Sequence, residues 1–298
     1  MTYIWPSPAK INLFLYVTGV RSDNYHYIQS LFQFLNYGDT LKIIVNNTGN
    51  IELFTEKELL LKAENTIIKA AKLLKSKALL YAKKNCNTLG ATIFLNKKIP
   101  MGSGLGGGSS NAATVFIVLN KLWKTQFTLE ELAKFSLKIG SDVPAFIMGK
   151  TSIVEGIGEI LHPIQKKEKW YLVVYPKIHI LTKSIFSNSL LKSTSQKKPI
   201  KLLLKSPFSN DFEDIVSNKF KKIQKLLSLL SLYAPTRITG TGSCVFSEFD
   251  DKISAQKIFS LLPQNVKGFI AKGVNTSLLH QIVYKRNTHI LNSKSILK

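Results

Sequence analysis

Residues 97–113 read KKIPMGSGLGGGSSNAA, and they stand between a predicted strand and a predicted helix. The β-branched and apolar residues 91–95 before them are typical of a strand. After them, apolar residues recur at helical spacing from 112 to 122. This order of strand, glycine-dense loop and helix brings main-chain N–H groups and the positive end of a helix dipole to one place.

The composition of this loop suits a polyphosphate. It holds five glycines and three serines, and no acidic residue occurs between Lys97 and Lys124. Glycines let the backbone approach an anion closely, and we expect Ser109, Ser110 and Asn111 to cap the helix. A simple glycine turn is the alternative, but a turn needs fewer glycines.

The loop differs from two common phosphate-binding patterns. No lysine follows its glycines, so the P-loop pattern is absent. The dinucleotide-binding pattern GxGxxG matches at Gly102, Gly104 and Gly107. That pattern also requires an acidic residue about 20 positions later, at the end of a second strand. Here residues 121–123 still belong to the predicted helix, which makes the match weak.

Length and composition are those of a globular protein with two domains. The chain has 298 residues, of which 45% are hydrophobic and 20% charged. Residues 163–169 are polar and basic, so we predict domains at 1–165 and 166–298.

The charge is strongly positive, with 41 basic against 18 acidic residues and a net charge of +23. Such an excess often marks nucleic-acid binders. The lysines are spread over many segments, however, which indicates solvated positions and an anionic ligand. We therefore predict no nucleic-acid partner.

Compartment signals point to the cytoplasm. The longest apolar run, near residues 226–234, is too short to span a bilayer, so we predict no membrane partner. Residues 1–6 lack the pattern of a secretion signal. Cys86 and Cys244 are too few and too isolated for a disulfide framework or a metal site.

Three further segments carry candidate functional residues with two interpretations each. Lys10 precedes the predicted strand 11–17 and is either a solvated edge lysine or a site residue. Asp142, shortly before Pro144, is a helix cap, a carboxylate facing a cleft, or both. Tyr25 and His26 are a surface aromatic and a packed histidine, or a ring and a hydrogen-bonding edge for a pyrimidine.

The remaining pattern predicts a mixed chain. Expected strands are 41–45, 51–54, 170–176 and 268–272, with a hairpin over 151–160 and a second glycine loop over 238–246. Expected helices are 65–83, 254–262 and one from a capping box at Thr128 to Gly140. We expect residues 187–207 to be mobile and the tail beyond 284 to be frayed.

Three segments together resemble the motifs of the GHMP kinases: residues 8–13, PAKINL, the loop at 100–110, and the second glycine loop. The resemblance implies an α+β fold of two domains. The first is like the second domain of ribosomal protein S5, and the second is ferredoxin-like. It also implies ATP as the phosphoryl donor, held by Pro100, Met101, Gly102, Ser103, Gly104, Leu105, Gly106, Gly107, Gly108, Ser109 and Ser110.

Two more segments resemble one branch of that family. Residues 18–26, TGVRSDNYH, and residues 31–41, LFQFLNYGDTL, are similar to the branch that phosphorylates the 2-hydroxyl of 4-diphosphocytidyl-2-C-methyl-D-erythritol in the non-mevalonate isoprenoid pathway. That branch usually has Gly at the position of Asn24, and Asn also tolerates a left-handed turn. The substrate-binding residues implied are Asn12, Tyr25, His26, Thr182 and Phe186. The segment 210–213 also matches the branch, and we expect it to place a helix structurally.

The resemblance also implies a mechanism. Asp142 would act as catalytic base, while Lys10 would keep it ionised and stabilise charge on the transferring phosphoryl group. ATP implies Mg²⁺, yet no acidic cluster is evident, so the phosphates with Ser109 or Ser110 would hold it and no protein metal site is assigned. We expect a monomer or weak homodimer.

Two rival functions differ from this one. A GHMP kinase for another small alcohol, such as homoserine or mevalonate, has no need of Tyr25, His26 and Phe186. A non-catalytic nucleotide-binding or RNA-binding protein with the same fold has no need of Lys10 and Asp142.

Overall fold

The computed structural model describes residues 3–56, 65–82, 88–186, 191, 195–205 and 207–284. The first part of the chain forms β1 (Ile4–Val20), β2 (His26–Asn46), β3 (Ile51–Thr55), α1 (Thr66–Ala82), β4 (Gly90–Asn96), α2 (Gly107–Leu122), α3 (Leu129–Ser136), α4 (Val143–Met148), β5 (Ser152–Glu155) and β6 (Ile160–Pro163). The second part forms β7 (Trp170–Tyr175), α5 (Thr182–Phe186), α6 (Ile200–Leu203), α7 (Glu213–Lys219), α8 (Lys221–Ser231), β8 (Thr236–Ile238), β9 (Val245–Phe249), α9 (Lys252–Leu261) and β10 (Lys267–Val274).

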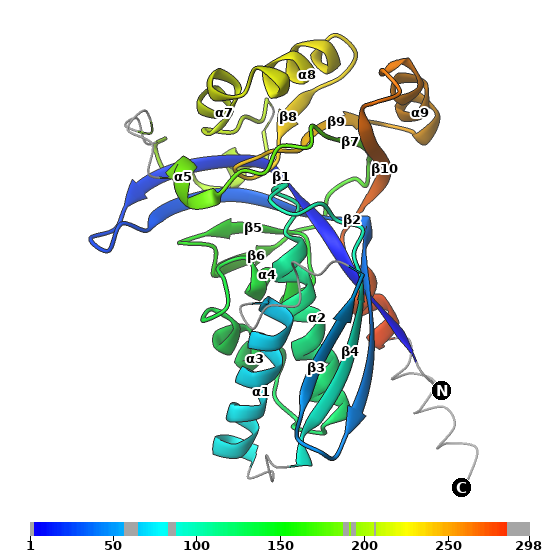
Figure 1. The fold of residues 1–298 in the computed structure, drawn as a ribbon. Coiled ribbons are helices and arrows are strands. Elements are labelled where there is room, and N and C mark those ends of the chain that lie inside the picture. The colour runs from blue at the N-terminus through cyan, green and yellow to red at the C-terminus, as the bar shows by residue number, and fades with distance from the viewer. Residues whose placement is uncertain are drawn as a thin grey trace, which may run out of the picture.

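The strands of both parts join one sheet, in the order β3-β4-β2-β10-β7-β9-β8, with β1 and β5 also paired to β2 (Figure 1). β1 and β2 form a long antiparallel hairpin that extends well beyond the predicted strands 11–17 and 41–45. At its turn Asn24 adopts φ 65°, the left-handed conformation expected for this position.

Irregular register in this hairpin has a consequence for the site. Register shifts occur between Pro8 and Lys10 and between Asn12 and Leu15. Such bulges bend a strand and redirect its side chains. Lys10 and Asn12 therefore lie on a segment of β1 that departs from regular pairing on both sides.

Helices cover one face of the lower part of the sheet (Figure 1). α1, α2, α3 and α4 bury their apolar residues there against β2 and β4. In α1 the predicted inner residues Ile67, Ala71 and Leu74 are buried, whereas Leu79, also predicted to face inward, is 54% exposed.

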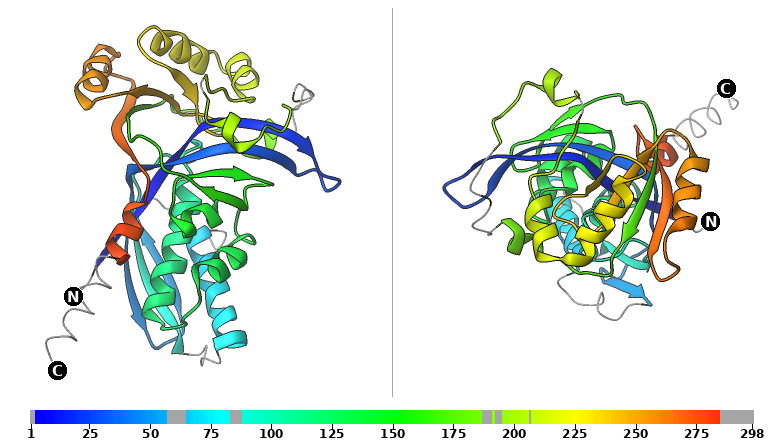
Figure 2. Two further views of the ribbon diagram at one scale, coloured as in Figure 1. Left: turned by 180° about the vertical axis from the view of Figure 1, so that it is seen from behind. Right: turned by 90° about the horizontal axis from the view of Figure 1, so that it is seen from above.

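The upper part of the sheet carries α7, α8 and α9 on its outer face, as the views from behind and from above show (Figure 2). Its inner face packs Tyr171 and Phe246 onto Phe14 and Leu31 of the long hairpin. The two parts thus share a core, and β10 pairs directly with β2 at Val274–Phe34. The two glycine loops contact each other where these parts meet.

The mixed α+β prediction is confirmed. The predicted helix 65–83 corresponds to α1, the hairpin predicted over 151–160 corresponds to β5 and β6, and the capping box at Thr128 is present. Two predictions about helix ends are wrong. Within the described chain no side chain caps α2: its N-cap is Gly106 at φ 71°, and Ser110 and Asn111 are buried. α3 ends at Ser136 rather than Gly140, because i to i+3 hydrogen bonds such as Ile139 N–H to Ser136 O tighten the chain into a turn.

Several predictions fall wholly or partly outside the described residues. These are the mobile segment 187–207, the frayed tail beyond 284 and the environment of Cys86. Within the residues that the structure describes, no helix is both long and apolar enough to cross a bilayer.

Candidate active site

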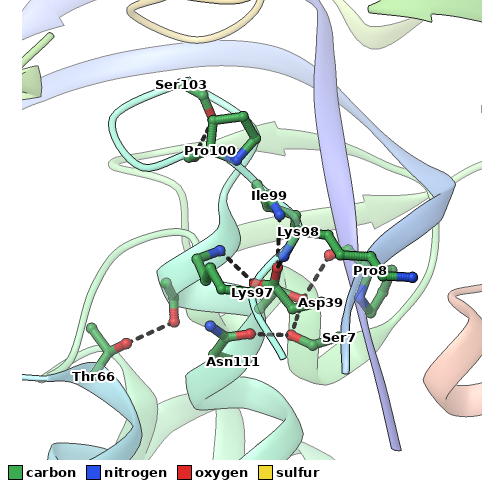
Figure 3. A network of polar contacts seen from close by, with 12 residues as sticks. Ser7, Pro8, Asp39, Thr66, Lys97, Lys98, Ile99, Pro100, Ser103 and Asn111 are labelled. Atoms are coloured by element: carbon green, nitrogen blue, oxygen red, sulfur yellow. Dashed lines mark hydrogen bonds and ion pairs between the residues drawn. The ribbon is translucent and has the colours of Figure 1, made fainter. Parts of the chain in front are cut away.

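The entry of the glycine-rich loop is held by a buried aspartate (Figure 3). One Asp39 oxygen, Oδ1, accepts the backbone N–H groups of Lys98 and Ile99, each at 2.7 Å. The other, Oδ2, accepts Lys97 Nζ at 2.5 Å. Sequence reasoning did not select Asp39. The available signal was an aspartate in a strand of largely buried apolar residues, since a buried carboxylate requires partners.

The tip of the loop is braced from the other part of the chain. Thr239 Oγ1 donates to Gly104 O at 3.2 Å, and the Cys244 N–H donates to Ser103 O at 3.1 Å. A Cβ on Gly104, whose φ is +77°, would lie 2.1 Å from Thr239 O, so this approach requires glycine. The second glycine loop therefore supports the first, as the resemblance implied.

The first turn of α2 begins directly after the loop. Ser110 N–H donates to Gly106 O at 2.9 Å, and the preceding N–H groups of the first turn have no partner within the helix. Gly108 is exposed. Ser110 is not available to a ligand, because its hydroxyl donates to Pro8 O at 2.6 Å and lies 2.9 Å from Ser7 Oγ.

Lys10 and Asp142 meet beside this loop. Lys10 Nζ lies 3.5 Å from Asp142 Oδ2, with the lysine side chain 5% and the aspartate 39% exposed. The Lys10 N–H also donates to Leu105 O at 3.0 Å, which ties β1 to the loop. Lys10 is thus not a solvated edge lysine.

Asp142 occupies the N-cap position of α4, yet among the described residues its side chain makes no capping hydrogen bond. Its carboxylate is instead directed to Lys10, and it is the more exposed member of this ion pair. The geometry therefore does not support a capping role for the side chain, and it leaves the carboxylate beside Lys10 and partly open to solvent.

Asn12 holds Lys10 in place. Its Oδ1 accepts the Lys10 ammonium, while its Nδ2 donates to Ser30 Oγ at 2.8 Å. The Asn12 backbone N–H donates to Thr239 Oγ1 at 3.0 Å. Asn12 thus connects the lysine to the second glycine loop, in addition to any contact with a substrate.

The aromatic residues predicted to bind a pyrimidine come together only in part. The rings of His26 and Phe186 have centroids 5.0 Å apart, although one lies in β2 and the other in α5. Phe212, from the segment 210–213 that was expected to have a structural role, supports Phe186 edge-on at 4.7 Å. Tyr25 directly precedes His26 at the hairpin turn, and the residue is 57% exposed.

Two polar features complete this end of the site. Burial lowers the pKa of His26 below its ordinary value, which favours a neutral ring with one donor and one acceptor. Thr241 Oγ1 donates to Thr182 Oγ1 at 3.3 Å, so Thr182 is linked to the second glycine loop. The second glycine loop therefore contacts both the glycine-rich loop and α5, the helix that carries Thr182 and Phe186.

No described part of the chain gathers three or more histidine, cysteine, aspartate or glutamate side chains into a group able to hold a metal ion.

Burial raises the pKa of the Cys244 thiol, which indicates an unreactive, structural cysteine.

Two family models match the chain. Residues 65–150 match the model of the GHMP kinases N terminal domain, and residues 189–267 match the model of the GHMP kinases C terminal. The first covers the glycine-rich loop and Asp142, and the second covers the second glycine loop.

Named relatives match over nearly the whole chain. The chain is 68% identical to a 4-diphosphocytidyl-2-C-methyl-D-erythritol kinase of Buchnera aphidicola subsp. Schizaphis graminum, covering 98% of this chain and 100% of that protein. It is 64% identical to a protein of the same name from Buchnera aphidicola subsp. Acyrthosiphon pisum, over 96% and 100%. A crystal structure of 4-(cytidine 5'-diphospho)-2C-methyl-D-erythritol kinase superposes with a TM-score of 0.75 at 25% identity, covering 91% of this chain and 99% of that one.

Proposed function

Because the chain belongs to the GHMP kinase family, and within it to the 4-diphosphocytidyl-2-C-methyl-D-erythritol kinases, we propose that the site described above transfers the γ-phosphoryl group of ATP to the 2-hydroxyl of that substrate. The reaction belongs to the non-mevalonate pathway of isoprenoid precursors. The observation that carries the proposal is the pair of Lys10 and Asp142 beside a glycine-rich loop that opens a helix.

The triphosphate lies on the loop and the first turn of α2. Residues 101–109 supply closely spaced backbone N–H groups, and the first turn of α2 contains no acidic residue. An anion at such a helix start gains hydrogen bonds from unpaired N–H groups and a favourable dipole. Lys10 adds a positive charge beside the loop.

Asp142 is the general base. Its carboxylate accepts the proton of the 2-hydroxyl while that oxygen attacks the γ-phosphorus, and the bond to the ADP oxygen breaks. Lys10 stabilises the negative charge on the transferring group, and Asn12 keeps the lysine directed to that position. Phosphoryl transfer depends mainly on such positioning and charge stabilisation.

The cytidine binds at the far end of the site, against Tyr25, His26 and Phe186. His26 and Phe186 already touch, so the base stacks on their exposed side together with Tyr25 rather than between the two rings. Thr182 lies on the path between this end and the reacting hydroxyl. Binding energy gained at the base orients the distant hydroxyl.

Mg²⁺ would be held chiefly by the phosphate oxygens. Of the two serines considered for it, Ser110 is buried and its hydroxyl is engaged with Pro8 and Ser7, which leaves Ser109 as the protein ligand. When bound, the ion neutralises charge on the β- and γ-phosphates.

We further assign domains 1–165 and 166–298, a division that leaves the two family matches on opposite sides. The enzyme acts in the cytoplasm as a monomer or weak homodimer on a small-molecule substrate, without nucleic acid or membrane. A related kinase for another small alcohol is the second candidate, but the identity of 68% to a cytidyl-substrate kinase and the contact of His26 with Phe186 favour the first.

Asp142→Asn tests the assignment of the base. We expect turnover to fall by at least about 100-fold, the usual effect of losing a general base, while ATP affinity is retained. Asp251→Asn is the matched control, because Asp251 is also an N-cap aspartate, at the exposed start of α9, and Asn caps equally well. Near-normal turnover of Asp142→Asn would refute the assignment.

A further inference from the structure

Asp39 and Lys97 form a buried ion pair that the proposed reaction does not use. Asp39 is 1% exposed and the Lys97 side chain 5% exposed. Replacing a buried ion pair by apolar side chains is often neutral or even stabilising, so stability alone is a weak reason for this arrangement. The position of the ion pair at the glycine-rich loop supplies a better reason.

The carboxylate acts at the entry of the glycine-rich loop (Figure 3). Asp39 Oδ1 accepts the N–H groups of Lys98 and Ile99, the last two residues before Pro100, where the chain leaves β4. These bonds fix the direction in which the loop departs from the sheet.

Lys97 connects the same carboxylate to the other end of the loop, where α2 begins. A Cβ on Gly107 would lie 2.8 Å from Lys97 Nζ, so the ammonium sits against the first residue of α2. Asp39 Oδ2 holds that ammonium at 2.5 Å. One buried side chain therefore restrains both the entry and the exit of the loop.

A separate set of bonds holds α2 to β1. Ser7 Oγ donates to Asn111 Oδ1 at 2.6 Å, and Ser110 Oγ donates to Pro8 O at 2.6 Å. These bonds would place the helix without Asp39, but they do not touch the residues at the loop entry. The loop entry is held by Asp39, together with a longer contact of the Tyr37 hydroxyl with Lys98 O at 3.4 Å.

We propose that Asp39 is a positioning residue for the nucleotide: it fixes both ends of the loop so that its N–H groups are arranged for the triphosphate before ATP arrives. A preorganised site avoids the cost of ordering the loop on binding. This inference rests on the proposed placement of the triphosphate on this loop.

Two substitutions separate the restraints. In Asp39→Asn the amide oxygen still accepts the two N–H groups, but the NH₂ group faces the Lys97 ammonium and the ion pair is lost. In Asp39→Glu the charge is kept, but the longer side chain displaces the carboxylate from the Lys98 and Ile99 N–H groups. We expect each to raise the KM for ATP about tenfold or more, the effect of losing a hydrogen bond to a charged group, with little change in the KM for the cytidyl substrate.

Asp251→Ala is the control for a purely structural effect. It removes the N-cap of α9 and lowers the thermal midpoint without touching the loop, so the KM for ATP should stay at its original value. If the Asp39 variants lower the thermal midpoint in the same way and leave the KM for ATP unchanged, Asp39 has only a structural role and the inference is wrong. Should Asp39→Asn not fold, Asp39→Glu, which keeps the ion pair, decides the question.

The placement of the triphosphate is tested separately by Gly108→Ala, which introduces a methyl group at the first turn of α2. If that variant binds ATP normally, the placement itself is wrong. If it binds ATP weakly while both Asp39 variants keep a normal KM, only the role of Asp39 is wrong.

Discussion

Gly108→Ala probes whether the triphosphate approaches the start of α2. Gly108 lies in the first helical turn, and its backbone φ is not in the left-handed region. A Cβ there would meet Thr66 Oγ1 at 3.6 Å and Thr66 Cγ2 at 3.9 Å, which are ordinary van der Waals contacts. The protein itself therefore has room for the methyl group.

The expected effects on folding and on binding have opposite signs. Alanine in place of glycine within a helix stabilises it by roughly 0.5–1 kcal/mol. A methyl group that keeps phosphate from the backbone removes a charge-assisted hydrogen bond worth about 1.5–3 kcal/mol, or roughly a 10- to 100-fold loss in ATP affinity. The neighbouring Gly106 is a poorer probe, because its φ is +71° and a Cβ would lie 2.8 Å from the Phe146 ring.

The assay combines calorimetric ATP binding with thermal unfolding of the same samples. Gly108→Ala should unfold at the same or a higher temperature and bind ATP more weakly. Gly19→Ala is the matched control: its Cβ would lie 3.4 Å from the Tyr27 ring, in the hairpin and away from the loop, so ATP affinity should not change. A stably folded Gly108→Ala protein with unchanged ATP affinity would refute the placement of the triphosphate.

Two other perturbations test separate parts of the molecule. Tyr25→Ala should raise the KM of the cytidyl substrate roughly ten- to a hundredfold, the cost of one stacking ring, with the KM for ATP unchanged; a loss of ATP affinity instead would place this ring at the adenine. His280 is buried with Nε2 donating to Ile147 O and Nδ1 accepting from Ser277, and burial lowers its pKa to about 4. The unfolded chain therefore binds a proton at this histidine before the folded chain does, and stability should fall by roughly 3 kcal/mol as pH drops from about 6.5 to about 4. His280→Gln should flatten that part of the stability profile, and an unchanged slope would mean that other groups cause it.

The glycine-rich loop and its flanking elements could be predicted from the sequence because they depend on local chemistry. Glycine density, a β-branched run before it and helical spacing after it are all properties of neighbouring residues. The predicted capping failed because the left-handed Gly106 starts α2 while Ser110 turns inward to Pro8, about a hundred positions earlier in the chain. Local sequence contains no sign of that contact.

The site residues depend more strongly on distant contacts. Taken alone, the strand around Lys10 is compatible with a solvated lysine; the irregular β1–β2 register and the ion pair with Asp142 place its side chain in a buried position instead. His26 and Phe186 are brought together by the packing of two halves of the chain, which only the family resemblance suggested. Asp39 escaped notice because its partners Lys98 and Ile99 lie nearly sixty residues away.

The most direct test of the proposed activity is steady-state phosphorylation of 4-diphosphocytidyl-2-C-methyl-D-erythritol by ATP, with phosphorus NMR locating the new phosphate. Mevalonate and homoserine serve as competing acceptors in the same mixture. We predict one product, phosphorylated at the 2-hydroxyl, with its rate unaffected by either competitor. No turnover of the cytidyl substrate, or preferential phosphorylation of mevalonate or homoserine, would contradict the proposed function.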